Sequence, residues 1–181
     1  MHPHLFTKMK RLATYGILTG LASAGWNFLE YTLTFKGQPL GRFSGLIAVL
    51  LLFFGLWQGI RAHRNQDKGG VITFWEAVLA GMAIALVAGL IQAGFVYVYH
   101  VGINPGFVAY VLETKRAELA AQGATPAQLA QVASKIRDVY QPLRLSLGIL
   151  GGCLVVGMVL TLIMASFLKR YPREEPFGAT G

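Results

Sequence analysis

The stretch from Ala77 to Tyr99 reads AVLAGMAIALVAGLIQAGFVYVY and contains 23 residues without any Asp, Glu, Lys or Arg. A helix rises about 1.5 Å per residue, so about 20 apolar residues cross the roughly 30 Å hydrocarbon layer of a bilayer. Three further uncharged stretches occur at Leu12–Leu29, Phe43–Ile60 and Leu145–Leu168. This pattern predicts four membrane-spanning helices, at about residues 12–34, 43–61, 74–100 and 143–169.

The composition of the 181 residues excludes two other classes of protein. Hydrophobic residues make up 54% and charged residues 13%, against about a quarter charged in an ordinary soluble domain. Such apolar stretches cannot stay solvated in a disordered chain. As core helices of a soluble protein, four of them would leave too little polar surface to cover them. We therefore expect an all-α, integral-membrane four-helix bundle that forms a single membrane domain.

The excess of positive charge, +8, is gathered near the predicted helix ends and is not interleaved with aromatic residues. Lipid headgroups are therefore the expected partner, and nucleic acid is not. One side of the predicted topology holds nine basic residues: Lys8, Lys10, Arg11, Arg61, Arg64, Lys68, Lys169, Arg170 and Arg173. The other side holds seven: Lys36, Arg42, Lys115, Arg116, Lys135, Arg137 and Arg144. Because basic loops favour the cytoplasm, this modest excess predicts that both termini are cytoplasmic.

The long connection before the last span, about residues 105–141, carries two amphipathic helical patterns. Gln122-Gly123 predicts the end of the first helix, and Thr125-Pro126-Ala127-Gln128 predicts a capped start for the second. The sequence thus predicts a helical hairpin outside the bilayer between spans three and four. Its helices could pack on each other, lie along the membrane or receive a partner, and periodicity does not choose among these.

Thr73 and Glu76 have the spacing of a capping box at the start of the third span. This assigns Glu76 a structural role at the membrane surface. The four histidines match no metal-ligand spacing, and the chain has no glycine-rich phosphate loop. We expect neither a metal nor a cofactor.

Several of these segments together resemble a known family. Gly69-Gly70-Val71-Ile72-Thr73-Phe74-Trp75-Glu76-Ala77 leads into a span, Asn104-Pro105 follows it, and a Gly-rich last span ends in Leu168-Lys169-Arg170. The order of these elements is similar to that of a bacterial family classified only as a domain of unknown function. The resemblance implies a four-span inner-membrane protein with a helical insertion before the last span, and it implies no reaction or catalytic residue.

Polar side chains within the spans are the candidate functional residues. Gly16, Gly20, Ser23, Asn27, Glu30 and Thr34 share one helical face, as do Gly81, Ala85, Ala88 and Gln92, and both faces should meet protein. Further small residues suited to close packing are Gly55, Gly59, Gly148, Gly152 and Gly157. We predict a polar cluster formed by Asn27, Glu30 and Gln92, with Arg42, His100 and Arg144 at similar depth. An intramembrane carboxylate such as Glu30 is costly unless it is paired or hydrated.

These observations favour a non-enzymatic assembly or accessory subunit, associated with itself or with other membrane proteins. The alternative is a small oligomeric transporter or channel that uses the polar cluster around Glu30. An integral-membrane enzyme has less support, because no nucleophile accompanies Glu30 and His100.

Overall fold

The computed structural model describes residues 3–35 and 44–170 of the chain. Six α-helices account for most of the described residues: α1 (Pro3–Phe35), α2 (Ser44–Ala62), α3 (Phe74–Val98), α4 (Phe107–Ala121), α5 (Pro126–Val139) and α6 (Pro142–Leu168). The π-helical segments η1 (His63–Asp67) and η2 (Tyr99–Ile103) extend α2 and α3. The predicted all-α fold class is confirmed, and the four segments predicted as spans overlap α1, α2, α3 and α6.

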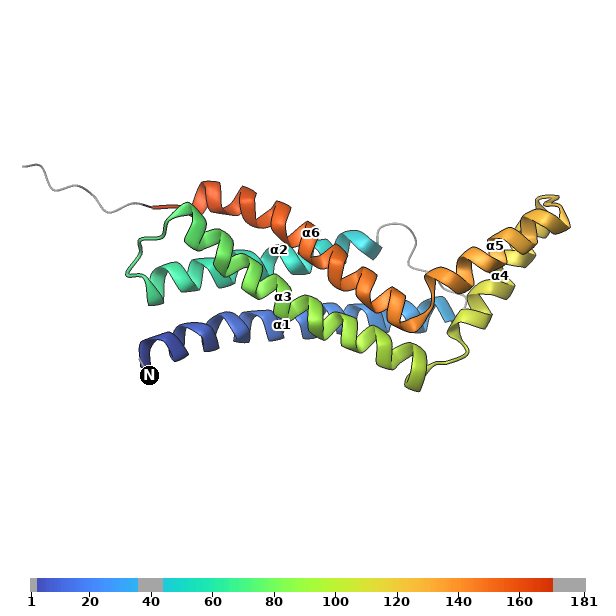
Figure 1. The fold of residues 1–181 in the computed structure, drawn as a ribbon, viewed down its shortest axis with the longest axis horizontal. Coiled ribbons are helices and arrows are strands. Elements are labelled where there is room, and N and C mark those ends of the chain that lie inside the picture. Colours follow the sequence, from blue (N-terminus) through green and yellow to red (C-terminus); the bar gives the residue numbers. More distant parts are fainter. Residues whose placement is uncertain (1–2, 36–43, 171–181) are drawn as a thin grey trace, which may run out of the picture.

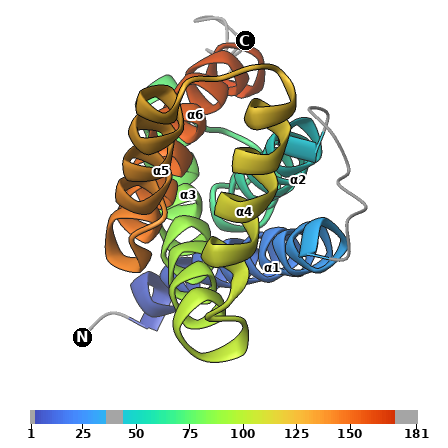
Figure 2. The same ribbon diagram turned by 90° about the vertical axis from the view of Figure 1, so that its right-hand side faces the viewer.

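The four long helices form an elongated bundle, and the α4–α5 hairpin projects from one end of it (Figure 1). We call this the hairpin end. The start of α1, the connection from α2 to α3 and the end of α6 meet at the opposite end, which we call the basic end. α3 packs extensively against both α6 and α1, and α2 packs mainly against α1. Figure 2 shows this arrangement along the bundle, with the hairpin in front.

Small residues allow the helices to approach closely, as their spacing predicted. A Cβ atom added to Gly16 would lie 2.6 Å from Cβ of Val87, and one added to Gly20 would lie 2.9 Å from Cβ of Ile91. α3 and α6 meet in the same way, because a Cβ on Gly157 would lie 2.7 Å from that of Ala85. Helix association in lipid depends on such packing, since burial of apolar surface provides little driving force there.

Two glycines of α6 do not have the packing role that their spacing suggested. Gly148 and Gly152 are exposed, and a Cβ atom at either position would meet nothing within 4 Å. Gly157, further along the same helix, is buried against α3. No neighbouring helix approaches α6 closely at these two positions.

Within residues 3–35 and 44–170, three helical segments are long and apolar enough to cross a membrane: Ser44–Asp67, Phe74–Ile103 and Pro142–Leu168. α1 has 33 residues, which is sufficient length, but its mean hydropathy is lower because one of its faces is small and polar. That face is turned inward, since Gly16, Gly20, Ser23 and Asn27 are buried. α1 is thus an integral part of the bundle although it is its least apolar long helix.

The apolar core is strongest toward the basic end. Leu56, Ile60 and Ile84 are fully buried there, together with Met164 near the end of α6. Ile72 adds a short backbone pairing with Arg170, with N···O distances of 3.0 and 2.9 Å in the two directions. This pairing ties the end of α6 to the segment that precedes α3.

The hairpin forms as its capping residues predicted. The Thr125 side chain accepts a bond from the Gln128 amide, and Pro126 occupies the first turn of α5. Gly123 follows α4 with a positive φ of 79°, a conformation that glycine adopts without steric cost. α4 and α5 pack on each other, which is the first of the three arrangements that the sequence left open. They project away from the bundle and do not fold back along it (Figure 1).

Candidate functional site

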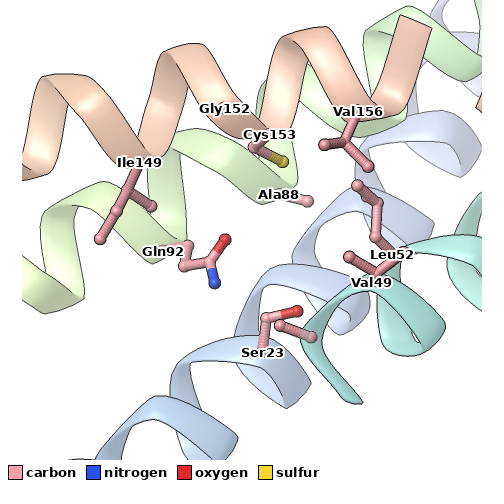
Figure 3. Close-up of a pocket in the computed structure, with 10 residues that line it drawn as sticks. Ser23, Val49, Leu52, Ala88, Gln92, Ile149, Gly152, Cys153 and Val156 are labelled. Carbon is pink, nitrogen blue, oxygen red and sulfur yellow. The ribbon is translucent and has the colours of Figure 1, made fainter. Parts of the chain in front are cut away.

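A cavity of about 190 Å³ lies between the four long helices, in the half of the bundle nearer the hairpin end. Ser23 of α1 and Gln92 of α3 are its polar side chains apart from the Cys153 thiol. We call it the central cavity, and its lining is completed by Ala48, Val49, Leu52, Ala88, Ile149, Gly152, Cys153 and Val156. Figure 3 shows the Gln92 amide and the Ser23 hydroxyl facing the space between the helices. Among the residues that the structure describes, no charged side chain lines this cavity.

The register of α1 against α3 explains why Gln92 lies with Ser23. Gly16 sits against Val87, and Gly20 sits against Ala88 and Ile91, so the next inward residue of α1, Ser23, is level with Gln92. Asn27 is buried one helical turn further toward the hairpin end. The sequence-based prediction had placed Asn27 and Gln92 at the same depth in the membrane, because each lies equally far from the start of its uncharged stretch. The contacts of Gly16 and Gly20 show that the actual register of α1 against α3 differs from this prediction by about one helical turn.

His100 lies in a second site, an aromatic cluster where the hairpin joins the bundle. Its ring is 5.4 Å from Tyr31, 5.5 Å from Tyr99, 5.4 Å from Phe107 and 6.2 Å from Tyr140, measured between centroids. These rings come from α1, η2, the first turn of α4 and the segment between α5 and α6. Edge-to-face pairs at such distances are favourable, so the cluster anchors the base of the hairpin.

The proton position on His100 follows from its hydrogen bond. Nδ1 lies 2.9 Å from the carbonyl oxygen of Val96, and a carbonyl only accepts, so Nδ1 carries the proton. Nε2 is buried and has no partner within the described chain. Its surroundings are aromatic rings, which suit packing better than proton transfer.

Glu30 is partly buried at the edge of the aromatic cluster. Burial and, secondarily, the negative charge of Glu30 raise the pKa of Tyr140 above its usual range, which places this carboxylate near Tyr140. Arg144 does not join Glu30, because it forms an exposed ion pair with Asp138. Arg42, the remaining member of the predicted cluster, lies outside the described residues. The expected single cluster is thus divided between the central cavity and the aromatic cluster.

Sequence reasoning missed an ion network at the basic end. Asp67, with only 5% of its side chain exposed, accepts from Arg11 at 2.7 Å and pairs with Nδ1 of His63 at 2.9 Å. These contacts join α1 to η1. The spacing of four residues between His63 and Asp67 was the available signal, but it falls where a loop was expected.

The capping box at the start of α3 is present with both of its reciprocal bonds. The Glu76 amide donates to the Thr73 hydroxyl at 3.3 Å, and the Thr73 amide donates to the Glu76 carboxylate at 3.0 Å. Lys68 also binds this carboxylate, which the sequence did not indicate. The Glu76 carboxylate therefore stabilises the start of α3. Within the part of the chain that the structure describes, no three His, Cys, Asp or Glu side chains gather as a metal site would require.

Residues 14–170 match the family described as "Protein of unknown function (DUF4199)". The match covers most of the chain, so the chain belongs to this family. No curated protein and no solved structure matches it.

Proposed function

We propose that this chain is a non-enzymatic, four-span protein of the bacterial inner membrane that serves as an assembly or accessory subunit. Its partners would be further copies of itself or other membrane proteins. The projecting hairpin carries this proposal. A two-helix unit with little burial of its own is suited to contact a partner outside the bilayer.

Burial within the hairpin supports this role. Across α4 and α5 only Phe107, Leu112 and Ala133 are buried. Apolar residues such as Val111, Val132 and Ile136 remain half-exposed between them. Most helical stability in proteins comes from packing of an amphipathic face. A partner that binds the half-exposed apolar residues between α4 and α5 would complete that packing.

The exposed face of α1 supports its assignment as the fourth membrane-spanning helix. Five large apolar side chains on this face are 44–58% exposed: Ile17, Leu18, Leu21, Phe28 and Leu29. Thr19, Ser23 and Asn27 of the same helix are buried in the bundle. Such a helix is apolar toward lipid and polar toward protein, although its average composition conceals this.

The basic end supports a cytoplasmic location for both termini. Arg61, Arg64, Lys68 and Lys169 join Lys10 and Arg11 there, and the positive-inside rule places such an end in the cytoplasm. Anionic headgroups would meet these side chains. A single cysteine at Ala120 in a Cys153→Ala background tests the orientation. In intact cells a membrane-impermeant maleimide should label this cysteine, and labelling only after cell lysis would overturn the assigned orientation.

The transport alternative has less support. Glu30 does not line the central cavity, and a pathway for a charged solute requires polar groups along its length. An enzymatic role likewise gains little, because the aromatic rings around His100 occupy the space where a substrate would have to lie.

The assembly proposal is tested by replacing residues 107–139 with a short Gly/Ser linker in the full chain. The size of the complex is then measured by mass photometry in native nanodiscs, and co-purifying proteins are identified. We expect the variant to insert in the membrane and to lose its companions or its self-association. Unchanged assembly of a correctly inserted variant would exclude the hairpin as the interface. Lys10→Ala, at an exposed position at the opposite end of the bundle, is the surface control and should leave assembly unchanged.

A further inference from the structure

The central cavity contains polar groups that no part of the described chain satisfies. Neither the Gln92 amide nor the Ser23 hydroxyl forms a hydrogen bond with residues 3–35 or 44–170. Thr19 and Ser146 each donate to the carbonyl four residues earlier, whereas the hydroxyl of Thr161, which does not line the cavity, also has no partner in the described chain. Ser23 is only 4% exposed and lines the cavity. An unsatisfied polar group in apolar surroundings is costly, so a ligand that pairs with it is favoured.

The size of the cavity suits a small organic group. A dry protein cavity of about 150 Å³ is known to hold benzene, and this one has about 190 Å³. Its walls are otherwise apolar, with Leu52, Ala88 and Val156 on three different helices. A six-membered ring with small substituents would therefore fit between the Gln92 amide and these walls.

The lining also defines the charge of the occupant. Because no charged side chain of residues 3–35 or 44–170 lines the cavity, a carboxylate or phosphate would lose its water without gaining a counter-ion from this part of the chain. An acyl chain alone would leave the Gln92 amide unpaired. A neutral molecule with a carbonyl oxygen satisfies both conditions, since a carbonyl accepts from an amide N–H or a hydroxyl.

The cavity opens on the side of the bundle beside α6, because Val49 of α2 and Gly152 of α6 line it and are exposed. A second hollow, of about 280 Å³, is lined by Val139, Arg144, Leu145, Gly148 and Ile149. Ile149 belongs to both hollows, so they adjoin each other on α6. Gly148 and Gly152 add no side chains to obstruct this surface. Because the second hollow includes Arg144 and reaches the base of the hairpin, an apolar tail would leave the cavity over the exposed Gly152 and lie against the lipid-facing side of α6 while its head stays at Gln92.

We propose that the central cavity binds a neutral, membrane-dissolved molecule whose carbonyl-bearing head pairs with Gln92 and Ser23 and whose apolar tail lies along α6. Quinones with alkyl or isoprenoid tails belong to this chemical class. The site differs from the hairpin surface proposed for assembly and does not depend on it.

The test uses the full chain in nanodiscs and decylubiquinone as the probe. Quinone binding is followed by quenching of tryptophan fluorescence, because the Trp26 indole lies on α1 less than one turn from Ser23 and donates to Ser44 at 3.2 Å. We expect saturable quenching above the linear background from partitioning into lipid. An alkane of equal tail length should not displace the quinone.

Two variants and one control identify the site. Gln92→Leu should raise the apparent Kd about three- to tenfold, as loss of one neutral hydrogen bond predicts. Ala48→Phe should abolish saturable binding by filling the cavity from α2. Gln58→Leu removes an exposed glutamine of α2 that does not line the cavity, and it should leave the Kd unchanged.

Three results would overturn this proposal. They are the absence of saturable quenching in the unmodified protein, equal displacement by the alkane, and an unaltered Kd in both Gln92→Leu and Ala48→Phe. Thermal unfolding of each variant, measured alongside, ensures that the comparison is between folded proteins. If Gln92→Leu unfolds, Ser23→Ala replaces it, with a rise in the apparent Kd expected and an unchanged Kd counting against the site.

Discussion

Replacing Gly81 by alanine should weaken the packing of α3 against α6. The new Cβ atom would lie 2.5 Å from Cγ2 and 2.6 Å from Oγ1 of Thr161, whereas carbon atoms in contact prefer about 3.5–4.0 Å. Thr161 is fully buried, and Ile60 Cδ1 lies 3.1 Å from the same point. Either the two helices separate by about 1 Å or Thr161 leaves its rotamer, and overpacking of this kind costs about 1–3 kcal/mol.

Gly94→Ala is the matched control on the same helix. Gly94 is exposed, and a Cβ atom there meets nothing within 4 Å. Both substitutions gain the same helix propensity, about 1 kcal/mol in favour of alanine in aqueous hosts, so this contribution cancels in the comparison. Gly81→Ala should therefore be less stable than Gly94→Ala by about 1–3 kcal/mol.

The measurement is reversible unfolding in mixed dodecyl maltoside and sodium dodecyl sulfate micelles, followed by circular dichroism. The free energy of unfolding is compared at one detergent ratio for the original protein and both variants. Equal stability of Gly81→Ala and Gly94→Ala would refute the argument, because it would mean that α3 and α6 are not in close contact at Thr161.

Two further substitutions test the ends of the bundle. Asp67→Asn should lower the free energy of unfolding by about 2 kcal/mol, because it leaves Arg11 and His63 without their buried carboxylate. Arg11 is partly exposed to solvent, which makes this loss smaller than for a fully buried ion pair. A change below about 0.5 kcal/mol in the same detergent titration would contradict that role. Phe107→Ala should cost about 3–5 kcal/mol and make the hairpin sensitive to brief trypsin digestion, since Phe107 is 2% exposed within the aromatic cluster. Phe167→Ala, at a position that is 77% exposed, should leave the digestion pattern unchanged, and a similar pattern for both variants would exclude Phe107 as the anchor.

Local features of the fold could be predicted because they depend on neighbours in the chain. The Thr73–Glu76 and Thr125–Gln128 capping boxes each join residues three apart, and both are present. Gly123 ends α4 where the sequence places a helix break, because its positive φ suits a residue without a Cβ. The inward face of α1 also followed from periodicity, since Gly20, Ser23 and Asn27 recur at helical spacing.

The candidate site could be predicted only in part. Gln92 and Asn27 were expected at one depth, but contacts of Gly16 and Gly20 with α3 place Gln92 beside Ser23. The Asp67 network was missed because its partner Arg11 lies 56 residues earlier. A pairing over such a distance leaves no periodic signal in a single sequence.

The sequence by itself determined that this is a helical protein with uncharged stretches of membrane-spanning length and a separate polar hairpin, because hydrophobic pattern and capping are local properties. Only the tertiary structure decided which polar groups meet. It divided Glu30, Gln92 and His100 between two sites and opened a cavity with unused hydrogen-bonding groups. The physical reason is that side-chain packing sets the register between helices, and one turn of register changes every neighbour of a polar side chain.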